Sequence, residues 1–152
     1  MTFVVRPVPL DRIMDLRVRV LRRGTPATTC GYPEDELPDV VHLAAINGAD
    51  VVIGTSTWFA RECPERPGIA AVQLKGMAVD ESVQTGGVGR ALIATGESWA
   101  RERGAGIVWA RARDTATGFY GKCGYSVVGE GFIDGPTAMP HHIVVRALTP
   151  GR

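Results

Sequence analysis

Three successive patterns of hydrophobic and polar residues stand out between residues 73 and 103. An apolar run that ends in Met77-Ala78-Val79 predicts a strand, and Gln84-Thr85-Gly86-Gly87-Val88-Gly89 predicts a tight glycine-rich loop. Apolar residues then recur with the period of a helix, and these are Val88, Ala91, Leu92, Thr95 and Trp99. We therefore expect a strand, then a loop, then a helix. The helix should cover about residues 86–103 and end before Gly104.

The strand predicted at residues 71–79 does not keep one alternation along its length. Gln73 and Lys75 are polar and should face outward, yet the apolar Met77 and Val79 also occupy odd-numbered positions. Since side chains alternate between the two faces of a strand, this change of face requires an irregular residue. We expect a β-bulge at or beside Gly76.

The rest of the chain alternates between short strands and helices. Apolar runs predict further strands at residues 2–6, 40–46, 51–59, 107–112, 126–128 and 142–147. Helical periodicity follows Asp11 as far as Gly24, and a short helix is expected at residues 115–122. Residues 25–38 and 129–140 have the composition of loops. Strands 71–79 and 107–112, joined through a helix, should be parallel.

Length and composition limit the classes of protein that this chain can represent. Its 152 residues, 45% of them hydrophobic, suit one domain with one core, and its net charge of +1 gives no reason to expect binding to nucleic acid or to a membrane surface. No apolar run reaches the roughly 18 residues that span a bilayer. The three cysteines lack metal-binding or C-x-x-C spacing, so we expect free thiols in the cytoplasm and no metal.

The glycine-rich loop has the features of an anion site. Gly86, Gly87, Val88 and Gly89 fall at the predicted start of the helix, where N–H groups lack acceptors within the helix. These N–H groups and the positive end of the helix dipole favour a phosphate, and glycine removes the Cβ that would keep it away. We expect a cradle for a pyrophosphate, with Arg90 as a cation at its rim.

Two motifs carry a resemblance to a known family. Gln84, Gly87 and Gly89 fill the fixed places of a Gln/Arg-x-x-Gly-x-Gly/Ala loop, which resembles the acetyl-CoA signature of the GCN5-related N-acetyltransferase (GNAT) superfamily. Residues 116–125, Ala-x-x-Phe-Tyr-x-x-Cys-Gly-Tyr, are similar to the superfamily's second block, with Tyr125 in place of the usual Phe. The resemblance covers most of the chain. It implies one acetyltransferase domain over residues 1–152 with an α/β fold (α+β by some schemes), in which helices flank a mixed, mostly antiparallel sheet with splayed central strands.

The resemblance also implies which residues bind acetyl-CoA. Splayed strands leave backbone groups of Met77 and Val79 to bond the pantetheine arm, and the N–H of Val79 is the expected oxyanion donor. Arg113 stands where many members have asparagine, so it is expected to contact the same ligand. The complete expected set is Met77, Ala78, Val79, Gln84, Thr85, Gly86, Gly87, Val88, Gly89, Arg90 and Arg113.

Acetyl transfer to an amine needs an acid for the leaving thiolate and a way to deprotonate the acceptor. Tyr120 matches the tyrosine that commonly protonates the thiolate in the family, although it could also pack or bond the sulfur without transferring a proton. His141 aligns with a histidine that precedes the last strand in related bacterial enzymes. Water remains the main rival for deprotonation, and the other candidate bases are His142, Glu34, Glu36 and Glu130.

These observations predict an acetyl-CoA-dependent N-acetyltransferase that acts by direct attack on a primary amine of a small molecule or peptide. The alternative is a non-catalytic acyl-CoA-binding sensor, whereas a dinucleotide-binding domain is disfavoured because the loop lacks Gly-x-Gly-x-x-Gly spacing. Glu34, Asp35 and Glu36 either attract a cationic acceptor or form a solvated acidic turn, and Tyr32 is a loop anchor or an acceptor contact. The acceptor's identity and a homodimer are left open.

Overall fold

The computed structural model describes residues 2–83, 86–135 and 137–149, and it divides into two compact units. Unit 1 consists of Met1–Phe59 and Lys75–Gly96. Unit 2 consists of Ala60–Leu74 and Glu97–Arg152. The predicted signature positions Gln84 and Thr85 lie outside the described residues.

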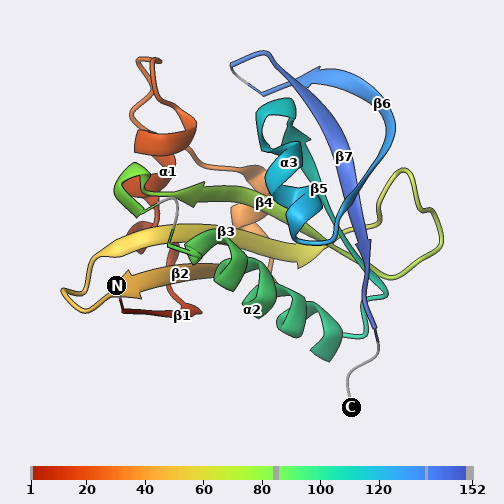
Figure 1. Cartoon of the computed structure of the whole chain (residues 1–152), viewed down its shortest axis with the longest axis horizontal. Coiled ribbons are helices and arrows are strands. Elements are labelled where there is room, and N and C mark those ends of the chain that lie inside the picture. Colours follow the sequence, from red (N-terminus) through yellow and green to blue (C-terminus); the bar gives the residue numbers. More distant parts are fainter. Residues whose placement is uncertain (1, 84–85, 136, 150–152) are drawn as a thin grey trace. The chain divides into compact units, whose positions relative to one another are not determined.

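Unit 1 is built on an antiparallel meander of strands β1 (Phe3–Pro7), β2 (Val41–Asn47) and β3 (Val52–Ala60, whose last residue belongs to unit 2) (Figure 1). The turn between β2 and β3 is stabilised by Asn47, whose side-chain oxygen accepts from the N–H groups of Ala49 and Val51. Helix α1 (Met14–Leu21) follows β1 through a 3₁₀ turn at Leu10–Arg12. The expected first helix is therefore shorter than the sequence pattern predicted.

Helix α2 (Val88–Glu102) approaches β3 closely through two glycines in unit 1. A Cβ at Gly54 would lie 2.5 Å from Cγ1 of Val88, and a Cβ at Gly96 would overlap the indole ring of Trp58. Trp58 is fully buried, so the mid-helix glycine makes room for the largest side chain of this core.

Unit 2 contains the first half of β4 (Ala71–Val79) and strands β5 (Ile107–Arg113), β6 (Ser126–Asp134) and β7 (Met139–Ala147). β4 pairs in parallel with β5, but their ladder ends at the pair Leu74–Ala110 although both strands continue. β7 pairs antiparallel with both β5 and β6. The described pairing of β4 with β5 therefore covers only residues 71–74 of β4.

The order of hydrogen-bonded strands is β1-β2-β3-β4-β5-β7-β6, which makes a seven-stranded sheet with β4 shared between the units. Of the pairings described, β4–β5 is parallel and the others are antiparallel. The predicted mixed, mostly antiparallel α/β fold is therefore confirmed. The remaining elements are the 3₁₀ turns Pro33–Glu36, Glu81–Val83 and Asp114–Ala116 and helix α3 (Thr117–Lys122).

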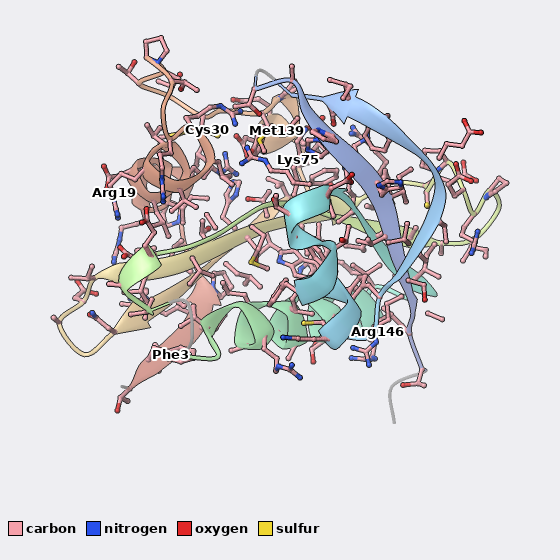
Figure 2. All side chains as sticks on the ribbon, turned by 45° about the horizontal axis from the view of Figure 1, so that its top comes forward. Phe3, Arg19, Cys30, Lys75, Met139 and Arg146 are labelled. Carbon is pink, nitrogen blue, oxygen red and sulfur yellow. The ribbon has the colours of Figure 1, made fainter. Side chains whose placement is uncertain are left out.

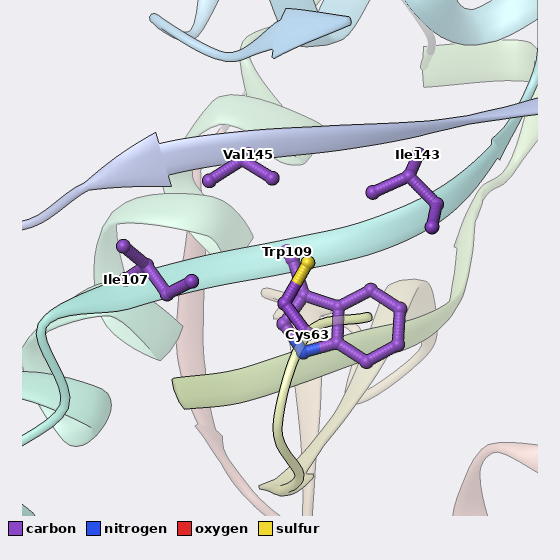
Figure 3. Close-up of a cluster of buried hydrophobic side chains, with 5 residues drawn as sticks. All are labelled: Cys63, Ile107, Trp109, Ile143 and Val145. Carbon is purple, nitrogen blue, oxygen red and sulfur yellow. The ribbon is translucent and has the colours of Figure 1, made fainter. Parts of the chain in front are cut away.

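The apolar core of unit 2 includes a cluster of Cys63, Ile107, Trp109, Ile143 and Val145 (Figure 3). The indole N–H of Trp109 donates to the carbonyl of Arg61 at 2.8 Å, which fixes the segment after β3 to this cluster. Such burial of a polar tip together with a bonded partner is how tryptophan is tolerated in a core.

Two sequence predictions need correction. Residues 129–140 were expected to form a loop, but β6 continues to Asp134 and β7 begins at Met139, because a register shift between Val128 and Phe132 absorbs the glycines. The predicted buried stripe of α2 is displaced, since Ile93 and Ala100 are buried while Trp99 is half-buried with Arg103 over its ring.

Candidate functional site

The expected phosphate cradle lies at the start of α2 in unit 1. The first backbone bond of this turn runs from the N–H of Ala91 to the carbonyl of Gly87 at 3.1 Å, so residues 88–90 have no acceptor four residues back within the helix. Gly86 was expected to contribute a free N–H, but this group donates to the carbonyl of Val83 at 3.0 Å. Gly86 therefore differs from the prediction, because its N–H already has an acceptor within the turn.

Exposure differs along this turn. Gly86, Gly87 and Arg90 are exposed, whereas Val88 and Gly89 are buried. Gly87 has a φ of 78°, a left-handed conformation that β-branched residues avoid, and nothing lies within 4 Å of where its Cβ would be. The turn thus presents bare backbone to solvent, and the Arg90 side chain starts beside it.

The other predicted cofactor positions of unit 1 lie at the end of β4. Gly76 has a φ of 67° inside the strand, the left-handed conformation of a glycine bulge. Beyond it, Met77 and Val79 are half-buried and Ala78 is buried. The positive φ of Gly76 agrees with the bulge expected there. The expected change of face is not seen, because Gln73, predicted to face outward, is buried, and Met77 and Val79 are less buried than Ala78.

Tyr120 lies on α3 in unit 2 with its ring buried between two aromatic neighbours. The rings of Phe119 and Tyr125 stand edge-on to it, at centroid distances of 5.4 and 5.6 Å. Its carbonyl accepts from the N–H groups of Cys123 and Tyr125, each at 3.0 Å, which closes the turn after the helix. Burial, with a smaller effect of the Cys123 thiol, raises the pKa of Tyr120 above that of a free tyrosine, so its hydroxyl stays protonated at neutral pH.

His141 lies on β7 in unit 2, between residues of the two neighbouring strands. It is opposite Arg113 on β5 and Phe132 on β6, and its ring stacks on that of Phe132 at 5.8 Å between centroids. Its Nδ1 lies 2.6 Å from the carbonyl oxygen of Met139. Because a carbonyl only accepts, Nδ1 carries the proton and Nε2 keeps the lone pair that a base needs.

The remaining candidate bases have different surroundings. His142 Nδ1 lies 2.7 Å from Oδ1 of Asp114, and this pair is partly exposed. Glu34 is buried and forms an ion pair with Lys75, whose Nζ is 2.6 Å from Oε1. Glu130 is exposed on β6, and Glu36 is exposed at the end of its turn. Of all the candidate bases, His141 and His142 each have an oxygen acceptor at Nδ1 that fixes the tautomer of the ring.

The acidic turn of unit 1 is only partly solvated: the side chains of Glu34 and Asp35 are buried, whereas Glu36 is exposed. Asp35 accepts two hydrogen bonds of 2.9 Å from Arg17, which is fully buried. Burial alone would raise the pKa of Asp35, but the hydrogen bond from Arg17 and the N–H of Tyr32 hold it below its usual value. Sequence reasoning missed Arg17, because an arginine in an arginine-rich helix ordinarily faces water.

Thr57 and His42 extend the buried network around Arg17. The guanidinium of Arg17 donates to Thr57 Oγ1 at 2.7 Å, and that oxygen lies 2.9 Å from Nδ1 of His42. Within the described residues, Nε of Arg17 is buried without a hydrogen-bond partner. Arg17 also stacks on Tyr32, 4.5 Å from the ring centroid, so Tyr32 is part of the packed turn.

The part of the chain that the structure describes contains neither a membrane-spanning helix nor a metal-binding group of side chains. No helix there combines the length and the apolar composition needed to cross a bilayer. No group of three or more His, Cys, Asp or Glu side chains there is placed to hold a metal ion. Cys30, Cys63 and Cys123 are buried free thiols.

The residues present fit a nucleotide-pantetheine cofactor at two places. The first turn of α2 offers N–H donors and Arg90 for phosphates, and the bulged end of β4 offers backbone groups for an extended arm. Arg113 and Tyr120 belong to unit 2 and supply a cation and a hydroxyl. The predicted cofactor and catalytic residues are thus divided between the units.

Comparison with known proteins connects this geometry to one family. The model of the acetyltransferase (GNAT) family matches residues 12–125. An uncharacterised N-acetyltransferase of Bacillus subtilis is 28% identical over 148 residues, which cover 97% of this chain and 98% of that protein.

Solved structures share the fold at low sequence identity. A structure of an aminoglycoside 6′-N-acetyltransferase complexed with coenzyme A has a TM-score of 0.73 at 15% identity, and the match covers 98% of this chain and 99% of that one. A chain in the NatC complex, bound to a Gag peptide and CoA, has a TM-score of 0.74 at 13% identity, with 98% and 100% covered. At such identities the likeness shows the fold alone.

Proposed function

Because the chain belongs to the acetyltransferase (GNAT) family, we propose that it transfers the acetyl group of acetyl-CoA to a primary amine of a small molecule or peptide by direct attack. The observation that carries the proposal is the start of α2. There, an exposed left-handed Gly87 precedes N–H groups that have no acceptor within the helix. The family's donor carries a pyrophosphate, which is the anion that such a turn binds.

The donor would be held by the two cofactor positions of unit 1 and by Arg113. The first-turn N–H groups of α2 and the guanidinium of Arg90 would bind phosphate oxygens, with Gln84 and Thr85 completing the loop. Backbone groups of Met77, Ala78 and Val79 would bond the pantetheine arm, because the left-handed Gly76 interrupts the regular strand just before them. Bound there, acetyl-CoA supplies a thioester whose carbonyl carbon accepts the amine.

The reaction forms one C–N bond and breaks one C–S bond. The uncharged amine attacks the thioester carbon, and the N–H of Val79 would stabilise the oxyanion of the tetrahedral intermediate. The C–S bond then breaks, and Tyr120 gives its proton to the sulfur. Burial raises the pKa of Tyr120, so the hydroxyl carries its proton when the thiolate leaves.

His141 would take the proton of the amine, directly or through one water. The Met139 carbonyl fixes its tautomer, so that Nε2 is the atom that accepts the proton. The proton then passes to solvent, and Tyr120 regains its own from solvent, which closes the proton balance. We further propose that residues 1–152 act as one domain in the cytoplasm, in keeping with a family match that includes residues from both units.

The test is a thiol-release assay across polyamines, aminoglycosides, amino acids and peptide N-termini, with Tyr120→Phe assayed alongside. We expect release of CoA with at least one amine and a kcat for Tyr120→Phe that is about 100-fold lower, which is the usual contribution of one general acid. Calorimetric affinity for acetyl-CoA should stay the same in Tyr120→Phe and be lost in Gly87→Val, where a β-branched residue cannot adopt the left-handed backbone.

The same assay separates the enzyme from a non-catalytic sensor. Tight acetyl-CoA binding without release of thiol from any amine would contradict the proposed transfer and favour a sensor. Unchanged acetyl-CoA affinity in Gly87→Val would contradict the phosphate cradle.

A further inference from the structure

The turn at residues 32–36 surrounds the ammonium group of Lys75 with a carboxylate and an aromatic ring. Nζ of Lys75 lies 2.6 Å from Oε1 of Glu34 and 4.5 Å from the centroid of the Tyr32 ring. A carboxylate combined with the face of a ring is how proteins bind alkylammonium groups. The chain's own lysine, labelled in Figure 2, therefore occupies a ready-made ammonium site.

The two partners of this ion pair differ in their freedom to move. The Lys75 side chain is 32% exposed on a flexible four-carbon stem, whereas the Glu34 side chain is 10% exposed. Glu34 lies in a 3₁₀ turn whose next residue, Asp35, binds Arg17 through two bonds of 2.9 Å. The ammonium group can therefore leave for water, while the carboxylate stays in place.

The ring of Tyr32 is fixed as firmly as the carboxylate. Its Cε2 lies 3.0 Å from where a Cβ of Gly76 would stand, so the ring packs against the bulge of β4. Its hydroxyl lies 3.5 Å from the thiol of Cys30, and the N–H of Tyr32 donates to Asp35 at 2.8 Å. Both halves of the ammonium site are thus preorganised.

The site also lies next to the reaction's expected position on β4. Lys75 and Gly76 directly precede Met77–Val79, and one strand residue advances by about 3.3 Å. Beside the ring, Arg17 is fully buried and keeps an unpartnered Nε among the described residues, 3.4 Å from the Cβ position of Gly76. A buried donor without a partner is uncommon in a packed structural network.

We propose that Glu34 and Tyr32 determine acceptor specificity by binding a second, cationic amine of the acceptor after Lys75 swings into solvent. The substrate class is then an amine that carries a further ammonium group, such as a diamine, a polyamine or a multiply aminated sugar. Exchange of one ammonium group for another keeps the buried carboxylate compensated, so the site binds without leaving an isolated charge. This inference rests on the proposed acetyl transfer.

The test compares diamines of three to six carbons with the matching amino alcohols, in which a hydroxyl replaces the second amine. We expect the wild type to prefer one diamine by about 10-fold or more in kcat/KM, which corresponds to one charge-assisted hydrogen bond. Glu34→Gln should remove this preference for the diamine over the matching amino alcohol. Lys75→Met should lower KM for the diamine by about 10-fold, because the internal competitor is gone.

Matched controls separate this effect from a general loss of charge. Lys122→Met removes an exposed lysine of α3, and Glu102→Gln removes a carboxylate at the end of α2. Neither should change the diamine preference. If the wild type turns over the diamine and the matching amino alcohol with equal kcat/KM, the inference is overturned. An equal loss of diamine and amino-alcohol turnover in Glu34→Gln also overturns it.

Calorimetry separates failure of the inference from failure of the proposed function. The preferred diamine is titrated into protein saturated with CoA, where no transfer is possible. Binding that is lost in Glu34→Gln and tightened in Lys75→Met supports the ammonium site even if no amine is acetylated. Acetyl transfer without such binding leaves the proposed function standing and overturns the ammonium site.

Discussion

Two ion pairs with a buried carboxylate, one in each unit, differ in how completely their polar atoms are satisfied. In unit 2, the carboxylate of Glu97 on α2 accepts from the hydroxyl of Tyr125 at 2.8 Å and from Arg146 at 2.8 and 3.1 Å. In unit 1, Arg17 binds Asp35 and Thr57 but keeps an unpartnered Nε. Both carboxylate oxygens of Glu97 accept hydrogen bonds. In the second pair, one guanidinium nitrogen of Arg17, Nε, has no partner among the described residues.

The surroundings of the two pairs support the same distinction between them. Arg146 is 38% exposed at its side chain and ties β7 to α2, so the Glu97 pair joins elements of one fold unit. The Arg17 pair holds a turn that carries Tyr32 and Glu34 against β4. We interpret the Glu97 pair as structural and the Arg17 pair as the support of a binding surface, because a network that only stabilises is normally fully satisfied.

The largest effect is expected for Arg17→Met. The variant leaves the carboxylate of Asp35 buried without its cation, so the free energy of unfolding should fall by about 3–5 kcal/mol. Urea unfolding followed by circular dichroism measures this change. A loss below about 1 kcal/mol would show that Asp35 reaches water or another cation, which would contradict the description of the pair as buried.

A smaller effect is expected for Glu97→Gln. The amide oxygen can still accept from Tyr125, and Arg146 can reach water, so the free energy of unfolding should fall by about 1–3 kcal/mol. The kcat/KM of the remaining folded protein for diamines and amino alcohols should not change. Altered acceptor preference in Glu97→Gln would remove the distinction between the two pairs.

Local patterns in the sequence were enough to predict the elements around the glycine-rich loop. The helical period and the irregular position at Gly76 depend on neighbouring residues, and the family resemblance rested on the same stretch. The predictions of the GNAT family, of the mixed sheet, of an acyltransferase and of acetyl-CoA as donor are confirmed at the level of the family. The roles of Tyr120, His141 and the cofactor-binding residues stay predictions.

The two ion pairs could not be read from the sequence because their partners are far apart along the chain. Glu97 meets Tyr125 and Arg146 across 28 and 49 residues, and Arg17 meets Asp35 and Thr57 across 18 and 40. On a helix, a glutamate at position 97 would ordinarily pair at the surface with Arg101, four residues later. Arg101 instead donates to the carbonyl of Thr149, so tertiary contacts override the local pattern.

The smallest expected effect is a dependence of stability on pH that arises at the Arg17 pair. Burial, followed by the nearby charge of Arg17, lowers the pKa of His42 below its usual value. As pH falls through about 6.5, His42 becomes protonated in the unfolded chain but stays neutral in the folded protein. The unfolded state then binds more protons, so the free energy of unfolding decreases until the folded pKa is passed.

The depressed pKa of Asp35 adds a second loss below about pH 4, where the unfolded carboxyl is protonated first. In His42→Gln, the decline between about pH 6.5 and 5 should be shallower, and the decline below pH 4 should remain. Urea midpoints measured at half-unit steps of pH, with Glu97→Gln as the matched variant of the other pair, test this. If His42→Gln keeps the full decline above pH 5, the titrating group lies outside the Arg17 network, and the acid sensitivity no longer distinguishes the two pairs.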